Sequence, residues 1–189
     1  MNKLRTFIAI ELSDEVKQTI KDIEDSLKVL GCDIKWVRPE IAHLTLKFLG
    51  DVDLDTIETI GRALKESVQG LPPIQTQLTQ LGIFPDIRRP RILWIGLDDK
   101  EGRIKQLAES VETALGSIGF KKEEREFKPH ITIGRLRSSK NAIQLAEAVK
   151  GFSGPAGRRQ SIDHITLFKS TLTPAGPIYE VLKKFSGSL

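Results

Sequence analysis

Two histidines of this chain stand in one recurring pattern, a histidine and a threonine that are separated and followed by aliphatic residues. The first copy is HLTL at positions 43–46, and the second is HITI at positions 130–133. Alternate side chains of a β-strand point to the same face, so in each copy the imidazole and the hydroxyl share one face. If the two strands lie side by side, their common face carries two imidazoles and two hydroxyls. Such a set can hold an anion and move protons on both sides of it.

The third and last histidine of the chain stands in the same pattern, HITL at positions 164–167. A lone His-x-Thr pattern is weak evidence for a site, because a strand that alternates around a half-exposed face produces it without any catalytic role. We therefore expect a site made from two of the three copies, with one copy forming an ordinary strand.

The composition is that of a globular protein. The chain has 189 residues, of which 39% are hydrophobic and 29% are charged. These values fit a single domain over residues 1–189, built as one body or as two small lobes packed together. No apolar run approaches the length that crosses a bilayer, and the first residues lack the apolar segment and cleavage site of a signal peptide. We therefore expect a cytoplasmic monomer with no membrane association.

The cysteine content, the histidine content and the net charge limit which metal sites, disulfides and binding partners are expected. The single cysteine, Cys32, excludes an internal disulfide and a cysteine-based zinc cluster. Three histidines without an HExxH motif or a paired-carboxylate motif offer no closed set of metal ligands, so we expect neither a metal nor a cofactor. The net charge of +4 mildly favours a polyanionic partner.

Hydrophobic periodicity predicts a mixture of strands and helices. Helices are expected after the cap residue Ser13 up to Gly31, and at residues 55–68, 98–117 and 142–150. Strands are expected at residues 6–12, 34–37, 42–49, 74–83, 91–97, 131–136 and 162–169. Residues 121–128 are densely charged, residues 151–159 read as a loop, and residues 179–185 fit either a strand or a short helix.

The order of these elements suggests a faint internal repeat. Each half of the chain has a strand, a helix, further strands that include a His-x-Thr strand, and a helix directly after it. The repeat predicts an α+β fold of two similar lobes related by a pseudo-two-fold axis. Each lobe would be an antiparallel sheet with helices packed outside, and the active-site cleft would lie between the two sheets.

Five ordered motifs run nearly from end to end of the chain. They are RTFIAI at 5–10, WVRPE at 36–40 with HLTLKFLG at 43–50, PRILWIG at 90–96, PHITIGR at 129–135, and LFKS at 167–170 with GPIY at 176–179. Together they resemble the two-histidine (2H) phosphoesterases, and within them the RNA 2′,3′-cyclic phosphodiesterases, also called 2′-5′ RNA ligases.

The resemblance implies hydrolysis of the 2′,3′-cyclic phosphate at an RNA end to a 2′-phosphate, without a metal. The family's two catalytic positions fall on His43 and His130, which leaves His164 outside the site. We assign His43 as the general acid and His130 as the general base, although nothing in the sequence breaks the symmetry between them. The hydroxyls of Thr45 and Thr132 would donate hydrogen bonds to the non-bridging phosphate oxygens.

Arg135 is the residue that we expect to compensate the negative charge of the bound phosphate. It lies five positions after His130, so on a regular strand the two side chains would point to opposite faces. A bend or a bulge between them is therefore required. The reverse reaction would be 2′-5′ RNA ligation without ATP, and the sequence has no Walker-type motif that would bind ATP.

The expected partner is RNA with a 2′,3′-cyclic phosphate end, for which tRNA fragments are one source. RNA ends can stack a base on an aromatic side chain and place phosphates beside basic residues. Each aromatic candidate could equally belong to the core, and each basic one to a solvated face. The aromatic candidates are Phe7, Trp36, Phe48 and Phe84, and the basic ones are Arg88, Arg89, Arg91, Lys121, Lys122, Arg158 and Arg159.

Two other classes of function stay open at this point. A related 2H enzyme could act on a small cyclic nucleotide, an ADP-ribose cyclic phosphate or a 2′-5′ oligoadenylate, and only a panel of substrates separates these. A non-catalytic RNA-binding module could keep the same fold. The paired His-x-Thr motifs argue against that module, because binding alone needs no pair of proton-transferring groups.

Overall fold

The computed structural model of the protein describes residues 3–155 and 158–187. In this part of the chain the elements follow one another as β1 (Lys3–Glu11), α1 (Asp14–Lys28), β2 (Ile34–Trp36), the 3-10 turn η1 (Pro39–Ile41), β3 (His43–Asp53), η2 (Leu54–Thr56), α2 (Ile57–Val68), β4 (Ile74–Phe84), β5 (Ile92–Leu97), α3 (Arg103–Ser117), β6 (His130–Leu136), α4 (Ala142–Gly151), β7 (Arg159–Ile162), β8 (His164–Thr173) and β9 (Gly176–Ser186).

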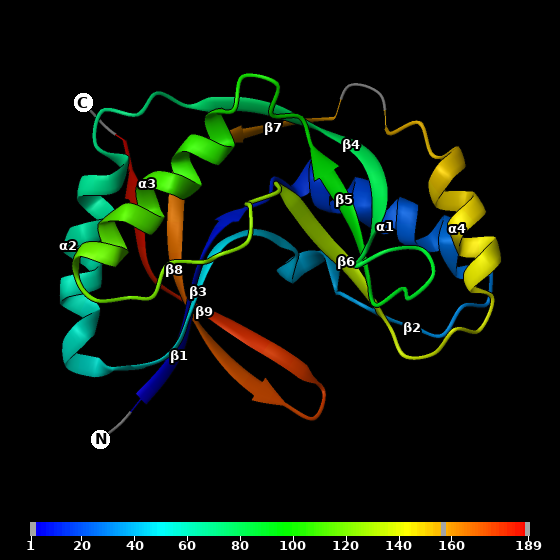
Figure 1. Ribbon diagram of the computed structural model, residues 1–189, viewed down its shortest axis with the longest axis horizontal. Helices are drawn as coiled ribbons and strands as arrows, with labels where there is room; N and C mark the ends of the chain where they lie inside the picture. Colours follow the sequence, from blue (N-terminus) through cyan, green and yellow to red (C-terminus); the bar gives the residue numbers. More distant parts are fainter. Residues whose placement is uncertain (1–2, 156–157, 188–189) are drawn as a thin grey trace.

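The strands form two lobes that share one curled antiparallel sheet. The strand order is β7-β4-β5-β6-β3-β1-β8-β9, and β2 pairs separately with β6. The two halves of this sheet meet where β3 pairs with β6, and that junction consists of the single pair Leu44–Ile131. Figure 1 shows one lobe built on β3, β1, β8 and β9, and the other built on β4, β5 and β6. The predicted two-lobe α+β fold is confirmed.

The lobes are not the two halves of the chain, as the repeat had suggested. The helix α1 follows β1 of the first lobe but lies beside α4 in the second, and α3 follows β5 of the second lobe but packs with α2 in the first (Figure 1). Asn141, which precedes α4, donates a hydrogen bond of 2.8 Å to the carbonyl of Leu30 just after α1. The lobes thus exchange helices, and one apolar core runs through both.

Local chemistry explains where the first helix begins and ends. The hydroxyl of Ser13 accepts a hydrogen bond from the Val16 amide, and Asp14 and Glu15 follow in the first turn, where the helix dipole favours acidic side chains. Gly31 has a φ of +63°, a left-handed conformation that glycine adopts without strain. The predicted N-cap and C-terminal glycine are therefore confirmed.

The largest difference from the sequence expectation lies near the C-terminus. The expected loop ended at residue 159 and the expected strand began at residue 162, but Arg159–Ile162 form a separate short strand, β7, on the edge of β4. Gln160 fixes this strand, because its buried side chain accepts a hydrogen bond of 2.9 Å from the Ser13 amide. The expected loop 151–159 also includes residues 156 and 157, which lie outside the described part of the chain.

The final segment, for which a strand and a helix were both open, is the strand β9. It pairs with β8 along its whole length, and the two form a hairpin that projects from the first lobe (Figure 1). Among the described residues, no helix has the length and apolar composition needed to span a bilayer.

Candidate active site

The pair that joins the lobes also brings the two motifs together. Leu44 and Ile131 are the second residues of their motifs, and both are fully buried on the core side of the sheet. Because side chains alternate along each strand, the histidines and threonines of both motifs point to the opposite face. We call this face, which carries His43, Thr45, His130 and Thr132, the motif face. The pairing of equivalent positions gives the site a local two-fold symmetry.

Both imidazoles are held in the same way. The Nδ1 of His43 lies 2.9 Å from the carbonyl oxygen of Ile41, and the Nδ1 of His130 lies 2.6 Å from that of Lys128. A carbonyl only accepts, so Nδ1 donates the hydrogen bond in each ring. In the neutral ring this leaves Nε2 as the basic nitrogen. Within residues 3–155 and 158–187, neither Nε2 has a hydrogen-bond partner, so both nitrogens are available to a ligand.

Burial shifts the pKa values of both histidines in the same direction. Desolvation lowers the pKa of His43 and of His130 below the ordinary value of 6.5, and the backbone hydrogen bond at Nδ1 opposes this shift in each case. A lowered pKa favours the neutral ring at pH 7, which is the form that can accept a proton. Because both pKa values shift in the same direction, the shifts do not distinguish the general acid from the general base.

Aromatic rings surround His43. Its ring centroid lies 4.9 Å from that of Phe7 and 5.3 Å from that of Tyr179, which it meets edge-on. Phe7 is buried and stacks on Phe168 at 5.1 Å. Phe7, Phe168 and Tyr179 therefore form a rigid support that fixes the orientation of the imidazole.

A second aromatic group supports His130. The ring of Phe84 meets His130 edge-on at 5.0 Å, and that of Trp94 lies 6.1 Å away. Trp94 lies flat over Gly82 on the neighbouring strand, where a Cβ atom would overlap the indole ring. Glycine at this position therefore makes room for the tryptophan beneath the histidine.

A bulge in β6 brings Arg135 to the motif face. Trp94 pairs with Thr132, but the next residue of β5, Leu93, pairs with Gly134, so Ile133 is an extra residue on β6. This shift reverses the alternation after Thr132. Arg135, opposite Ile92, therefore shares the face of His130. The bulge that the sequence required is present.

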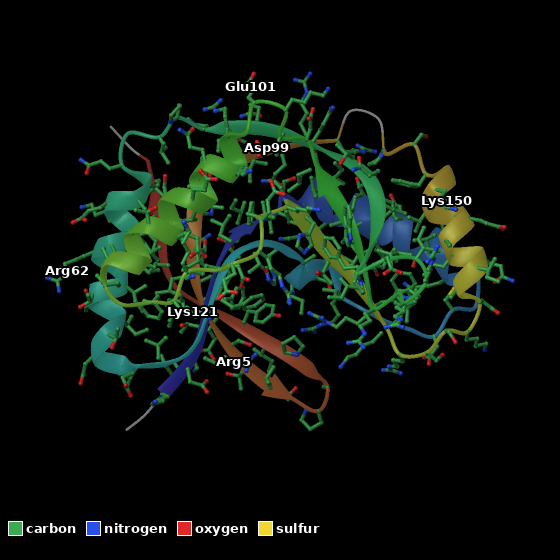
Figure 2. The ribbon with its side chains drawn as sticks, in the orientation of Figure 1. Arg5, Arg62, Asp99, Glu101, Lys121 and Lys150 are labelled. Carbon is green, nitrogen blue, oxygen red and sulfur yellow. The ribbon has the colours of Figure 1, made fainter. Side chains whose placement is uncertain are left out.

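Two further residues reach this face that the sequence analysis did not select. The phenol of Tyr179 lies within electrostatic range of Arg135 and Arg5, and burial raises its pKa while the two guanidinium groups oppose the shift. Figure 2 shows Arg5 beside the β8–β9 hairpin. Tyr179 belongs to the quoted GPIY motif, and Arg5 stands two residues before Phe7 on the same strand. Alternation from Phe7 could have found Arg5.

The third His-x-Thr motif does not join the site. Both ring nitrogens of His164 have carboxylate partners, Asp163 at Nδ1 and Glu11 at Nε2, and Thr166 donates to Glu11 at 2.9 Å. Burial alone would raise the pKa of Glu11, but hydrogen bonds from Lys184, Thr166 and His164 lower it to about 2. These contacts make His164 part of a polar cluster on β1, β8 and β9.

The RNA-contact candidates divide between the two faces of the sheet. Trp36 pairs with Gly134 on the core side, where the Lys28 ammonium lies 5.9 Å from its ring, so the structure does not bring it to the site. Phe48 is 67% exposed and lies beside Phe7, with 5.9 Å between their ring centroids. The seven basic candidates are all exposed, on several separate segments. Among the described residues, no group of three or more histidine, cysteine, aspartate or glutamate side chains could hold a metal ion.

Comparison with known proteins identifies a family whose sequences resemble this chain. A family model described as the 2′-5′ RNA ligase superfamily matches residues 12–174. The RNA 2′,3′-cyclic phosphodiesterase of Methanocaldococcus jannaschii is 36% identical over 182 residues, which cover 96% of this chain and 100% of the relative. The protein of the same name from Thermotoga maritima is 36% identical over 188 residues, covering 98% of each chain.

Solved structures show the same fold. LigT of Escherichia coli in its apo form superposes with a TM-score of 0.81 at 24% identity, over 98% of each chain. TT0787 of Thermus thermophilus superposes with a TM-score of 0.80 at 24% identity, over 97% of each chain. The match of the family model and of the full-length relatives means that this chain belongs to the 2′-5′ RNA ligase superfamily.

Proposed function

We propose that the protein hydrolyses the 2′,3′-cyclic phosphate at the 3′ end of an RNA to a 2′-phosphate, by general acid–base catalysis without a metal. The observation that carries this proposal is the pairing of Leu44 with Ile131, which gives one face two imidazoles and two threonine hydroxyls. The relatives named RNA 2′,3′-cyclic phosphodiesterase support the choice of substrate. Both motifs come from one chain, so a monomer suffices.

The chemistry follows from the free nitrogens of the two rings. The Nε2 of His130 takes a proton from water as the water oxygen attacks phosphorus. The bond between phosphorus and the ribose O3′ breaks, and the protonated Nε2 of His43 gives its proton to O3′. The product has a 2′-phosphate and a free 3′-hydroxyl. If the 5′-hydroxyl of another RNA replaces water, the same steps form a 2′-5′ linkage without ATP.

The remaining residues bind the phosphate. The Thr45 and Thr132 hydroxyls flank the shared face and donate to the two non-bridging oxygens. The Arg135 guanidinium compensates the charge that these oxygens carry in the transition state. None of these roles needs a metal or a nucleotide cofactor.

The test is turnover of an oligoribonucleotide with a 2′,3′-cyclic phosphate end in buffer with EDTA and without ATP. The 2′- and 3′-phosphate products are resolved by chromatography. We expect the 2′-phosphate alone. A cyclic mononucleotide, a 2′-5′ oligoadenylate and a cyclic-phosphate-ended tRNA fragment complete the panel. Turnover of the mononucleotide or the oligoadenylate in preference to the RNA ends would contradict the proposed substrate class.

A further inference from the structure

Arg5 lies on the motif face near the beginning of β1. The ring of Phe7 lies 4.9 Å from that of His43, so Phe7 points to the motif face. β1 pairs with β8 from Thr6 to Ala9 without a register shift, so the alternation of side chains along β1 is regular there. The side chain two residues before Phe7, which is that of Arg5, therefore points to the same face.

Tyr179 connects Arg5 to the two motifs. The ring of Tyr179 meets His43 edge-on at 5.3 Å, and its phenol is within electrostatic range of both Arg5 and Arg135. The two guanidinium groups come from different lobes, since Arg5 lies on β1 and Arg135 on β6. The proposed mechanism uses Arg135 to compensate the phosphate that reacts. It gives no task to the second cation beside the same phenol.

The Arg5 guanidinium is exposed and is not engaged by an acidic side chain. Among the residues that the structure describes, its side chain has no hydrogen bond and no ion pair, even though Asp51 lies opposite it on β3. Glu180, the acidic residue next to Tyr179, pairs with Lys169 at 3.0 Å instead. An anionic ligand can therefore bind Arg5 without breaking a contact within the protein.

We propose that Arg5 binds the phosphodiester on the 5′ side of the terminal nucleotide, and that this contact makes the protein prefer RNA ends to cyclic mononucleotides. This inference rests on the proposed function. The terminal ribose carries the cyclic phosphate at O2′ and O3′ and the next phosphodiester at O5′, so the two anionic groups are one ribose apart. A nucleoside 2′,3′-cyclic phosphate has no anion at the second position.

The type of residue fits this role. A guanidinium group can donate two parallel hydrogen bonds to two oxygens of one phosphate, whereas an ammonium group acts as a point charge. A phosphodiester contact is independent of the base, so it would select an RNA chain without selecting its sequence.

The direct test measures binding of two dinucleotides by calorimetry. Both end in a 2′-phosphate, so no turnover is needed. One has a natural phosphodiester between its nucleotides, and the other has an uncharged methylphosphonate there. We expect wild-type protein to bind the phosphodiester probe about tenfold more tightly than the methylphosphonate probe. Arg5→Gln should bind both probes with the Kd that wild type has for the methylphosphonate.

Two variants serve as controls. Arg62→Gln removes an exposed positive charge from α2, where the Arg62 side chain contacts only Thr59 on its own helix. Figure 2 shows Arg62 on the outer side of this helix, away from Arg5. This variant should match wild type on both probes. Arg5→Lys keeps the charge but loses the paired hydrogen bonds, so it should keep a preference of about threefold for the phosphodiester.

Turnover gives a second measurement of the same contact. With a dinucleotide that ends in a 2′,3′-cyclic phosphate, Arg5→Gln should raise KM about tenfold and change kcat less than about threefold. With a nucleoside 2′,3′-cyclic phosphate, Arg5→Gln and wild type should have the same kcat/KM, because this substrate lacks the phosphodiester.

The outcomes distinguish this inference from the proposed function. Equal weakening of both probes in Arg5→Gln would show that Arg5 acts through Tyr179 or through the fold, and would overturn the inference. A wild-type protein that binds the two probes equally, or binds neither, would overturn it as well. A wild-type protein whose preference for the phosphodiester depends on Arg5, but which turns over no cyclic phosphate, would contradict the proposed function and leave the phosphodiester site standing.

Discussion

At the residue scale, the proposed mechanism depends on two histidines that are alike in hydrogen bonding and in the direction of their pKa shifts. Each ring donates from Nδ1 to a carbonyl two residues earlier. Their roles must therefore come from what each faces in the complex, and leaving-group chemistry can separate them. A substrate with sulfur at the 3′ position has a leaving thiolate that needs no protonation.

We therefore expect the 3′-thio cyclic substrate to rescue one variant only. His43→Ala should lose about 10³-fold in kcat on the oxygen substrate and less than about tenfold on the thio substrate, because the acid is no longer required. His130→Ala should lose about 10³-fold on both, because water still needs a base. Rescue of His130→Ala in place of His43→Ala would reverse the assignment of acid and base.

The lowered pKa values also make a prediction about pH. In the proposed mechanism the general acid must be protonated in the free enzyme, and burial lowers the pKa of both candidate histidines below 6.5. The protonated fraction then falls about tenfold per pH unit above that pKa, so kcat/KM should decline before pH 7. A profile from pH 4.5 to pH 8.5 tests this. A plateau in kcat/KM that extends beyond pH 7.5 would show that the acid has a raised pKa.

The sequence could predict the motif residues but not their full surroundings. Strand alternation indicated that His43 and Thr45 share a face. The spacing of five residues between His130 and Arg135 required a bulge if both side chains were to share a face. The pattern could not show that β3 has a bulge at Leu46, because the bulge is visible only in the pairing with β1, where Thr45 pairs with Ala9 and Lys47 with Ile8. Nor could it exclude His164, because one of its two carboxylate partners, Glu11, lies far away in sequence on β1.

At the element scale, a buried ion pair ties the first motif strand to α3 and to the segment that leads into β6. The bulge in β3 turns Lys47 to the core side, where its side chain is 6% exposed and its ammonium lies 2.7 Å from Glu112. The same ammonium donates to the carbonyl of Lys121 at 2.8 Å. Lys121 is labelled in Figure 2. Lys47 thus fixes the segment 121–128, whose Lys128 carbonyl orients His130.

Lys47→Met should lower the free energy of unfolding by about 3 kcal/mol, because it leaves the Glu112 carboxylate buried without its partner. Urea denaturation measures the change. Lys105→Met is the matched control, since Lys105 pairs with Glu126 of the same segment at 3.0 Å but both side chains are well exposed. Its loss should stay below about 1 kcal/mol. Equal losses in the two variants would contradict a structural role for the buried pair.

Helices and strands were predictable from the sequence where hydrophobic periodicity was strong. The way in which these elements pack against one another was not predictable. The stripes of α1 and α2 and the alternation of the motif strands predicted those elements. The short strand β7 was not predicted, because it is only four residues long and its register depends on β4. The exchange of α1 and α3 between the lobes was not predicted either, because a repeat in the order of elements does not indicate which part of the sheet each helix covers.

At the scale of the whole molecule, one buried carboxyl group links stability to pH. Glu24 on α1 is 2% exposed, and its Oε1 lacks a hydrogen-bond partner among the described residues. Burial raises the pKa of Glu24 from 4.5 to about 7, against the attraction of Lys28 and with the repulsion of Asp25 and Glu40. The folded state therefore holds this proton more tightly than the unfolded chain does.

The consequence is a loss of stability as pH rises. Between pH 4.5 and about 7 the unfolded chain releases this proton first, so the free energy of unfolding should fall by about 3 kcal/mol and then level off. Glu24→Gln should remove this slope, and the stability difference between variant and wild type should grow by about that amount from pH 4.5 to pH 8. Parallel pH profiles from urea denaturation at each pH would contradict the linkage.

The central claim is that two of the three histidines perform the chemistry on one shared face. The most direct measurement is steady-state turnover of the cyclic-phosphate oligonucleotide by wild type, His43→Ala, His130→Ala and His164→Ala, with folding checked by circular dichroism. We predict losses of about 10³-fold for the first two variants and activity within about threefold of wild type for the third. A folded His164→Ala that loses as much as the others, or a folded His43→Ala or His130→Ala that keeps its activity, would contradict the account.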